Sequence, residues 1–402
     1  MMPFSQSPRD PGFVQSPWSF YDRARAAGPL FHWTDYGFPC AAGHPEVSAI
    51  LRDRRFGREA PPGTLPEPPE HLAPFHAFAE NSMLEREPPA HTRLRGLVTR
   101  AFVSRRIARL APEIAALSAG LIERLPAGGG DLLPVWCERI PVIIIARLLG
   151  VPEEAADQLL AWSHDMVAMY QARRDRAVED RAVAATLAFS AYLSDYIAAR
   201  RRRPAEDLIT ELIAAEEAGD RLTTDELIGS CIQLLNAGHE ATVHALGLGV
   251  KAILEAGADP DELFAGEDAT AGTVEEILRF DPPLHLFTRY ALEDVEVFGH
   301  RLARGRKVGL LLGAANRDPA MFSDPHSFDP HRRGPGHLAF GAGIHFCVGA
   351  PLARLELQVA LPDLFRRLPQ LRLDQTPTYA DRFHFRGLEA LRVAYEGPIR
   401  PE

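Results

Sequence analysis

The chain has 402 residues, 46% of them hydrophobic and 8% aromatic, which is enough apolar material for a large buried core and argues against disorder. Its formal net charge of −10 gives no electrostatic support to binding of nucleic acid or an anionic membrane. The four cysteines stand far apart and form no CxxC pair, which argues against a disulfide framework or a four-cysteine zinc site and fits a reducing cytoplasm.

The N-terminal region has no apolar core. Its first 19 residues include charged side chains and four prolines, so we expect neither a signal peptide nor a membrane anchor there. The longest apolar stretch, residues 140–151, is interrupted by Arg147 and is too short to cross a bilayer. We therefore expect a soluble, cytoplasmic protein.

The first half of the chain predicts a few strands followed by helices. The Pro-rich stretch 60–74 is expected to be a long surface loop rather than a linker, because the fragment before it is too small to fold well alone. From residue 91 to about 216 the apolar spacing is mostly helical, and it is broken once at Gly128-Gly129-Gly130. The predicted elements are a helix around 21–27, strands around 30–33 and 38–42, and helices over 107–125 and 183–197.

A long helix follows. Thr223 and Glu226 form a capping box, and the helical pattern then runs to about Glu255 and ends near Gly257. At 1.5 Å per residue such a helix is about 45–50 Å long, so it would cross the whole molecule. A helix that is both this long and this apolar must be buried.

The last third of the chain mixes strands with two more helices. A helix over 273–280 stops at Asp281-Pro282-Pro283, and a strong final helix begins after Cys347 and ends near residue 368. Between them lies an irregular stretch, 318–336, rich in Pro, Asp, His and Gly. Strand-like alternation occurs in residues 286–290, 295–298 and 307–312. These elements predict one mainly α domain over residues 1–402 with a minor β part.

The segment 340–349 contains the residues with the clearest chemistry. Its glycines allow the backbone to turn tightly and to approach a flat ligand. Cys347 falls at the start of a helix with Pro351 in its first turn, and a helix N-terminus favours a thiolate. A thiolate on haem iron favours O–O cleavage. The alternatives are a buried cysteine that acts as a small hydrophobe, or a zinc pair with His345 that lacks two further ligands.

The pattern F-G-x-G-x-H-x-C-x-G, followed by Leu352-Ala353-Arg354, resembles the cysteine loop of the bacterial soluble cytochrome P450 family, the haem-thiolate monooxygenases. The resemblance extends over essentially the whole chain. It implies the mainly α cytochrome P450 fold with a minor β part, enclosing haem b in a single domain. It implies Cys347 as the ligand to the iron, Phe340 beside its sulfur and His345 at a haem propionate. Gly341 and Gly349 complete the loop.

Three further signatures occur in the family's order. Glu276 and Arg279 match E-x-x-R, and the resemblance implies that they are buried with Arg332 as the third member, for which Arg333 could substitute. His91 and Arg95 match H-x-x-x-R, and Arg289 matches a third propionate ligand. Each of these could alone be a surface residue. Given Cys347, we interpret the second and third signatures as charge-assisted pairing with a buried dianion.

The family's oxygen-activation pattern, A-G-x-E/D-T-T/S, aligns with residues 237–242 of the long helix. The resemblance implies that Gly238 permits a local distortion of the helix and that Glu240 relays protons. Ala241 stands where a threonine hydroxyl normally assists protonation. Thr242 does not obviously replace it, since one residue further is about 100° around the helix. Water or a substrate hydroxyl replaces the threonine, or the enzyme performs another oxidation, or oxygen chemistry is lost.

Substrate contacts are expected on the same helix and on the following strand. These residues are Gln233, Asn236, Ala237, His285 and Phe287. The Pro-rich loop and residues 75–84 are expected to cover the pocket. Ordinary core packing is an equally good interpretation of any one of these positions, and His244 could simply pair with Glu240 at i+4.

The implied reaction inserts one oxygen atom of O₂ into a small to medium-sized organic substrate. Electrons would come from NAD(P)H through a separate ferredoxin and ferredoxin reductase, and an arginine cluster would dock the acidic ferredoxin. This cluster comprises Arg93, Arg100, Arg105, Arg106 and Arg354. The alternatives are phenol coupling, desaturation or peroxide use, and a non-catalytic haem-thiolate sensor. A sensor needs neither Glu240 nor Gly238.

Overall fold

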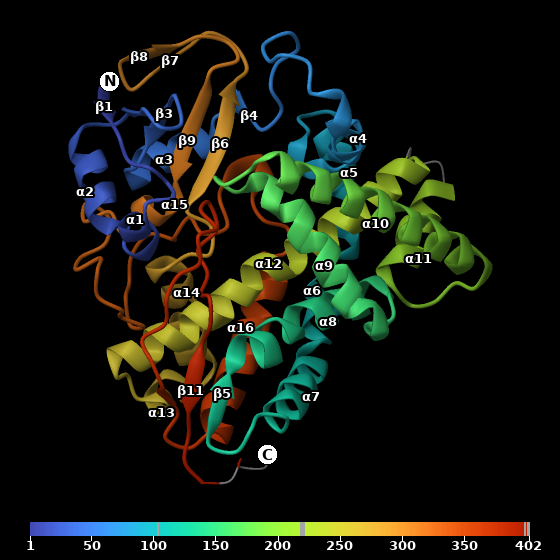
Figure 1. Cartoon of the computed structure of the whole chain (residues 1–402), viewed down its shortest axis with the longest axis vertical. Helices are drawn as coiled ribbons and strands as arrows, with labels where there is room; N and C mark the ends of the chain where they lie inside the picture. Colours follow the sequence, from blue (N-terminus) through green and yellow to red (C-terminus); the bar gives the residue numbers. More distant parts are fainter. Residues whose placement is uncertain (103, 218–221, 398, 400–402) are drawn as a thin grey trace.

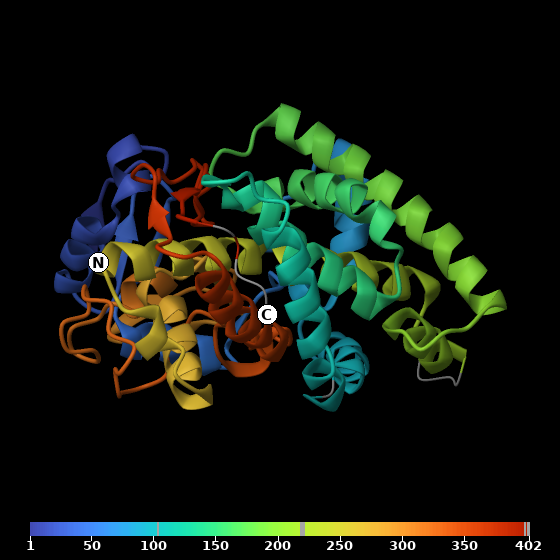
Figure 2. The same ribbon diagram turned by 90° about the horizontal axis from the view of Figure 1, so that it is seen from below.

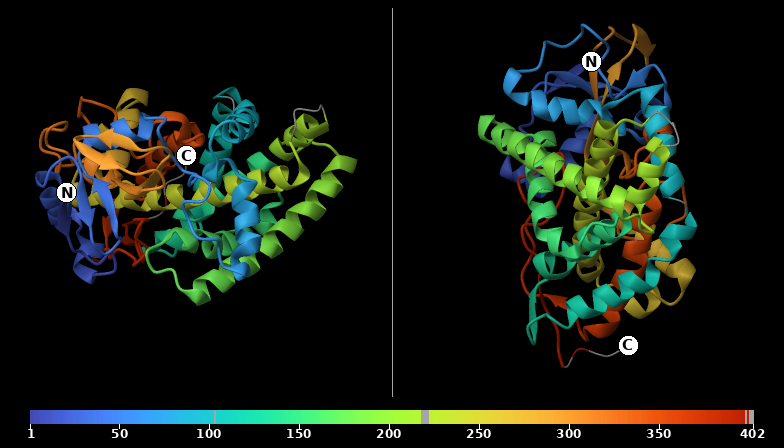
Figure 3. Two further views of the ribbon diagram at one scale, coloured as in Figure 1. Left: turned by 90° about the horizontal axis from the view of Figure 1, so that it is seen from above. Right: turned by 90° about the vertical axis from the view of Figure 1, so that its right-hand side faces the viewer.

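The six-stranded sheet lies around the N-terminal segment of the molecule, helices form most of the rest, and β5 and β11 lie at the opposite end (Figure 1). This computed structural model describes the backbone of residues 1–102, 104–217, 222–397 and 399, and the side chains of these residues apart from 100, 101, 104, 105 and 217. Figure 3 shows the same separation from above, with the sheet at one end and the helices α9 (Ala156–Val167), α10 (Arg176–Arg202) and α11 (Leu208–Glu217) at the other.

The remaining helices follow the chain order. They are α1 Pro11–Gln15, α2 Trp18–Ala26, α3 His44–Arg52, α4 Ala73–Glu80, α5 Ala90–Ala101, α6 Ser104–Ala108, α7 Ala111–Ile122, α8 Arg139–Leu149, α12 Thr224–Ala256, α13 Pro260–Leu263, α14 Glu267–Phe280, α15 Leu312–Ala315 and α16 Ala350–Arg367. Short 3₁₀ turns occupy Glu70–Leu72, Met83–Glu85, Glu153–Ala155, Ala168–Tyr170 and Gly343–His345, and Leu133–Cys137 forms a π-helical turn.

Within the described part of the chain, the strands form three sheets. The largest has six strands in the order β1 Met2–Phe4, β2 Phe31–Trp33, β3 Phe38–Ala41, β9 Lys307–Leu311, β6 Leu286–Ala291 and β4 Phe56–Gly57. The second joins β10 Arg372–Leu373, β11 Arg392–Ala394 and β5 Gly129–Asp131, and the third joins β7 Val295–Val297 and β8 His300–Leu302. Antiparallel pairing of β6 with β9 sets Arg289 opposite Val308, which fixes the position of this candidate site residue.

The long helix α12 crosses the middle of the molecule (Figures 1 and 2). The predicted capping box at its start is confirmed, because the Thr223 hydroxyl accepts from the Glu226 N–H and the Glu226 carboxylate accepts from the Thr223 N–H. Gly257 ends the helix in the left-handed conformation, with φ of 60°. Most of its side chains are buried, as its length and apolar composition require.

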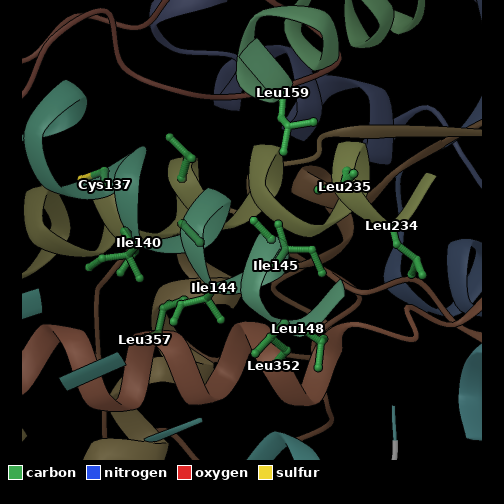
Figure 4. Close-up of a cluster of buried hydrophobic side chains, with 14 of the residues drawn as sticks. Cys137, Ile140, Ile144, Ile145, Leu148, Leu159, Leu234, Leu235, Leu352 and Leu357 are labelled. Atoms are coloured by element: carbon green, nitrogen blue, oxygen red, sulfur yellow. The ribbon is translucent and has the colours of Figure 1, made fainter. Parts of the chain in front are cut away.

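Aliphatic side chains of α8 fill the space between α12 and α16 (Figure 4). Figure 4 shows Ile144 and Leu148 pointing toward Leu352 and Leu357 of α16. Ile145 lies against α12 so closely that a Cβ at Gly238 would stand 2.7 Å from its Cγ1. Residues Thr224–Ala256 are α-helical throughout. The expected distortion at Gly238 is therefore not observed, and the close approach of α8 accounts for this glycine.

One helix is long and apolar enough, by length and composition, to cross a membrane, namely α10 among the described residues. The sequence analysis considered only the stretch 140–151 and found it too short to cross a bilayer. Helix α10 lies against α9, α4 and α12, and one face is buried, including Phe189, Leu193 and Ile197. A single such helix is weak evidence for a membrane, because helices that pack against a protein core pass the same test.

Several predicted boundaries were wrong for identifiable reasons. The helix expected over 107–125 is divided into α6 and α7, and the helix expected from 183 begins at Arg176, where Asp175 caps it. The triple glycine does more than break a helix, because it supplies most of β5 and pairs with β11, far away in the sequence. Helix α14 begins at Glu267, six residues before the predicted start.

A buried ion cluster anchors the irregular stretch that leads to the cysteine loop. Arg279 forms a bidentate pair with Glu276, with Nε–Oε2 at 2.7 Å and Nη2–Oε1 at 2.8 Å. Its Nη1 also donates to the carbonyls of Asn316 and Pro325. Arg332 lies 3.4 Å from Glu276, whereas Arg333 is exposed. Arg332 is therefore the third member.

The cluster predicts a large stability difference between two arginine variants. Arg279→Ala should lower the free energy of unfolding by about 3–5 kcal/mol, because it leaves the buried Glu276 carboxylate without its bidentate partner. Arg176→Ala is the control, since it breaks an exposed pair with Asp180 in α10 and should cost less than about 1 kcal/mol. Urea unfolding followed by circular dichroism measures both. Equal losses would contradict the anchoring role.

Candidate active site

The cysteine loop is held by its own backbone. The Cys347 N–H donates to the Phe340 carbonyl at 3.1 Å, which closes the loop just before α16 begins. Gly341 and Gly343 have φ values of 68° and 72°, which other residues rarely adopt. A Cβ at Gly343 would also stand 2.2 Å from the Leu51 carbonyl oxygen. The loop therefore requires glycine at these two positions.

Cys347 differs from the other cysteines. It is exposed, whereas Cys40, Cys137 and Cys231 are buried. Although part of the residue is accessible, burial by the surrounding protein raises the pKa of the Cys347 thiol, while N–H groups at the start of α16 and the Arg95 guanidinium act to lower it. The expected net lowering by the helix N-terminus is not observed. Burial therefore outweighs the helix N-terminus, which acts in the predicted direction.

Two basic residues of α5 face the cysteine loop, one turn apart. The His91 ring lies 4.2 Å from the His345 ring, and Arg95 Nη2 donates to the Phe346 carbonyl at 2.6 Å. His91 is buried, and its Nδ1 has no hydrogen-bond partner among the described residues. Burial, with His345 and Arg95 nearby, lowers the pKa of His91 to about 4. The i, i+4 spacing thus places both residues beside the cysteine loop, and their binding of haem propionates stays a prediction.

Arg289 reaches the same region from β6. It is buried, and burial together with the neighbouring Arg58 lowers its pKa to about 9. A guanidinium that is destabilised in this way favours an anionic partner. The charges of Glu87 and Glu85 partly compensate for it.

His345 has a protein partner that the sequence did not reveal. Its Nε2 lies 2.8 Å from Glu87 Oε1, and this pairing helps to keep the pKa of the carboxyl low against burial, which would raise it. In this structure the partner of His345 is Glu87, and its contact with a haem propionate stays a prediction. Glu87 stands just before Pro88-Pro89 and α5, a position that no sequence pattern had singled out.

A short stripe of α12 is accessible, although residues 229–250 of this helix are otherwise buried. Ala237 is exposed, and Gly238 and Ala241 are half-buried, whereas Thr242 is buried. Residues four apart share a helix face, so Ala237 and Ala241 open onto the same space. Thr242 lies about 100° away from Ala241, as expected. No hydroxyl of α12 takes the place of the missing threonine on this stripe.

Glu240 lies on the side of α12 that faces α9. Its carboxylate oxygens are 3.3 Å from His164 Nε2 and 3.4 Å from His244 Nε2. Burial alone would raise the pKa of Glu240, but the two histidines hold it well below its usual value. Burial acts to lower the pKa of His164, yet the Glu240 carboxylate outweighs it and leaves the pKa raised. The sequence anticipated the pairing with His244 but missed His164, which is far away along the chain.

The expected substrate contacts on α12 differ in their surroundings, because Gln233 and Asn236 are buried whereas Ala237 is exposed. Gln233 Oε1 accepts from the Leu84 N–H at 3.3 Å, so the segment before α5 does lie over α12. Asn236 points toward Met166 of α9, with Nδ2–Sδ at 3.6 Å, and its Oδ1 has no hydrogen-bond partner within the described residues. Ala237 alone is exposed. These positions therefore do not form one continuous stripe.

His285 was wrongly expected to line the pocket. It is fully buried, its Nδ1 lies 2.8 Å from the Tyr21 hydroxyl, and its Nε2 lies 3.5 Å from Asp281. It precedes the first residue of β6 and turns into the polar core of the sheet region rather than toward α12. Phe287 is half-buried and packs close to Gly341 of the cysteine loop.

The arginines expected to dock a redox partner are engaged within the chain where their side chains are described. Arg93 pairs with Glu226, Arg106 with Glu211, and Arg354 with Glu275. The side chains of Arg100 and Arg105 lie outside the described residues.

Comparison with known proteins identifies the family. The family model of cytochrome P450 matches residues 269–379. The chain is 38% identical over 397 residues to the cytochrome P450 monooxygenase PikC of Streptomyces venezuelae, which covers 95% of this chain and 92% of PikC. The chain belongs to the cytochrome P450 family. This P450 is an oxidoreductase, since its relatives are named monooxygenases and hydroxylases.

Two further comparisons cover the chain almost completely. The biotin biosynthesis cytochrome P450 of Bacillus subtilis is 34% identical over 98% of this chain and 100% of its own length. The crystal structure of P450BioI, in complex with an acyl carrier protein ligated with hexadec-9Z-enoic acid, superposes with a TM-score of 0.90 at 34% identity and covers 96% and 100% of the two chains.

Family membership implies a haem cofactor, and the residues present fit it. Cys347 is an exposed residue at the start of α16, which matches the thiolate ligation of the family. His91 has an unpartnered buried ring nitrogen, and Arg95 and Arg289 are basic groups partly or wholly buried around the same loop. These three residues would hold the propionates. His345 is paired with Glu87 in this structure.

The ligand assignment predicts a spectroscopic loss. In the reduced protein with carbon monoxide, Cys347→Ser should abolish the strongly red-shifted Soret band, because a serine hydroxyl replaces the sulfur of the only exposed cysteine among the described residues. Cys40→Ala is the control, since Cys40 is buried in the sheet region and should leave the band in place. A band that survives Cys347→Ser would contradict the assignment.

Proposed function

We propose that this P450 inserts one oxygen atom of O₂ into a small to medium-sized organic substrate. One observation carries the proposal: the accessible stripe Ala237, Gly238 and Ala241 interrupts a buried helix directly beside the buried acid Glu240. A protein that only binds haem needs neither space beside this helix nor a charged carboxylate in its core. Burying a carboxylate costs free energy that only its partners offset, and buried groups with strongly shifted pKa values cluster at functional sites.

Each group has a defined task in this proposal. When bound through Cys347, haem supplies the activation of O₂. His91, Arg95 and Arg289 orient it through its propionates. The Glu240 carboxylate accepts and releases a proton within the packed part of α12. His164, whose side chain is 39% exposed, connects this carboxylate with solvent. Ala237 and Ala241 leave room for substrate, while Gln233 positions the segment before α5 above them.

We propose a ferredoxin with its reductase, supplied by NAD(P)H, as the source of electrons. A concavity of about 480 Å³ beside the cysteine loop supports docking on this face, and it is lined by His44, Arg52, His337 and Phe346 among others. The internal pairs of Arg93, Arg106 and Arg354 weaken purely electrostatic steering there. The rate at which this P450 is reduced by NAD(P)H and the reductase should rise when the ferredoxin is added. A rate that is the same with and without the ferredoxin would contradict the proposal.

Labelled oxygen tests the reaction. In a reconstituted system supplied with NADH and ¹⁸O₂, the product of a ligand that shifts the haem from low spin to high spin should contain one ¹⁸O atom. Thr242→Ala should change the yield little, because Thr242 is buried and lies away from the accessible stripe. A product oxidised without label would favour desaturation or coupling instead.

Ala241 predicts that the coupling of NADH to product depends on the substrate. A ligand with a hydroxyl near the iron should couple well, and its deoxy analogue should bind but release mostly peroxide or water, because protonation needs a donor within about 2.6–3.2 Å. Ala241→Thr should improve coupling for small deoxy ligands and weaken binding of the larger native substrate. NADH consumption and product are measured together.

Glu240→Gln is the comparison variant for this prediction. It should slow turnover for every substrate, because it removes the charged acid rather than the donor next to the substrate. Equal coupling of hydroxylated and deoxy ligands, with no response to Ala241→Thr, would show that solvent alone delivers the protons.

A further inference from the structure

Three potential metal ligands meet where α9 packs on α12. They are His164 of α9 and the adjacent residues His239 and Glu240 of α12, and their ligand atoms all lie within 4.8 Å of one another. His164 Nε2 is 3.3 Å and His239 Nε2 is 3.8 Å from the same oxygen, Glu240 Oε2. A divalent ion with bonds of about 2.0–2.1 Å needs ligand atoms separated by slightly more than 3 Å, so small adjustments suffice.

The tautomer of His239 leaves a lone pair directed at this cluster. Its Nδ1 lies 2.7 Å from the Leu235 carbonyl oxygen, which can only accept, so Nδ1 holds the proton. Burial lowers the pKa of His239, which favours the neutral ring with Nε2 unprotonated, and Nε2 is buried without a hydrogen-bond partner among the described residues. Two acceptors, this nitrogen and Glu240 Oε2, thus face each other with no proton between them. A cation between them removes that conflict.

The groups around the three ligands are of the kind that orients metal-binding histidines and carboxylates in proteins. A backbone carbonyl fixes the ring of His239, and His244 lies 3.4 Å from the other oxygen, Glu240 Oε1. A Cβ at Gly387 would stand 2.2 Å from His244 Nδ1, so this glycine allows the ring its position. Glu138 favours and Arg382 disfavours positive charge at His164. The partial exposure of His164 gives an entry path from solvent.

We propose that His164, His239 and Glu240 form a Zn²⁺ site, and that its occupation blocks proton transfer through Glu240. Two imidazoles and one carboxylate are a donor set that Zn²⁺ accepts, whereas Mg²⁺ prefers an all-oxygen shell. Three protein ligands leave the fourth position to water. The ion competes with the proton that otherwise joins His164 to Glu240 and cross-links α9 to α12.

Direct binding tests the site. Haem-loaded protein without a histidine tag is titrated with ZnCl₂ by calorimetry, with equilibrium dialysis for stoichiometry. We expect one Zn²⁺ per chain, a higher thermal midpoint, and no binding of Mg²⁺. His239→Gln and His164→Gln should each weaken binding at least about tenfold. The exposed His331→Gln is the matched control and should bind like the parent. Unchanged affinity in both cluster variants would overturn the site.

The effect on turnover rests on the proposed function and is measured separately. Zn²⁺ should inhibit the parent reversibly, with recovery on adding a chelator, and should not inhibit His239→Gln relative to its own metal-free rate. Reduction of cytochrome c by the ferredoxin system alone controls for effects on the partners. Stoichiometric binding without inhibition would keep the site but overturn Glu240 as the proton relay, so the two failures are distinguishable.

Discussion

The burial of one 33-residue helix constrains the rest of this molecule. Helix α12 has no solvent-facing side over most of its length, so every neighbouring element must supply a surface that fits it. Aliphatic residues of α8 and α16 do so on one side (Figure 4). Residues of α9 and α10 do so on another. Apolar packing of this kind tolerates few polar groups, and those that occur must be paired or functional. The charged and accessible positions of α12 are for that reason the best guides to its chemistry.

Buried charge is handled in two different ways in this protein. The Glu276, Arg279 and Arg332 cluster is saturated by hydrogen bonds and joins a helix to an irregular stretch. The group around Glu240 is not saturated, since His239 Nε2 and both ring nitrogens of His244 have no hydrogen-bond partner among the described residues. A saturated cluster fixes geometry, whereas an unsaturated one retains capacity to bind a proton or an ion. This difference separates an anchor from a candidate reactive group.

Features encoded locally were predictable from the sequence, and features that depend on distant packing were not. Both ends of α12 could be predicted because a capping box and a C-terminal glycine lie within a few residues of them. The cysteine loop is likewise contiguous. The pairing of Glu240 with His164 depends on the packing of α9 against α12, and that of His345 with Glu87 on the approach of two loops. The prediction for His285 was wrong because the alternation of the strand was extended to the residue before the first residue of β6.

Helix α12 supplies no complete path for a proton between its two functional faces. Ala237 and Ala241 open on one side, while Glu240 turns toward α9, about 100° from Ala241 around the helix. A proton that leaves Glu240 must therefore pass around the backbone to reach the accessible stripe. Thr242 is displaced by a similar angle in the opposite direction and is buried. The last donor in the path must come from outside α12, either from ordered water or from the substrate, and the identity of residue 241 decides whether that external donor is needed.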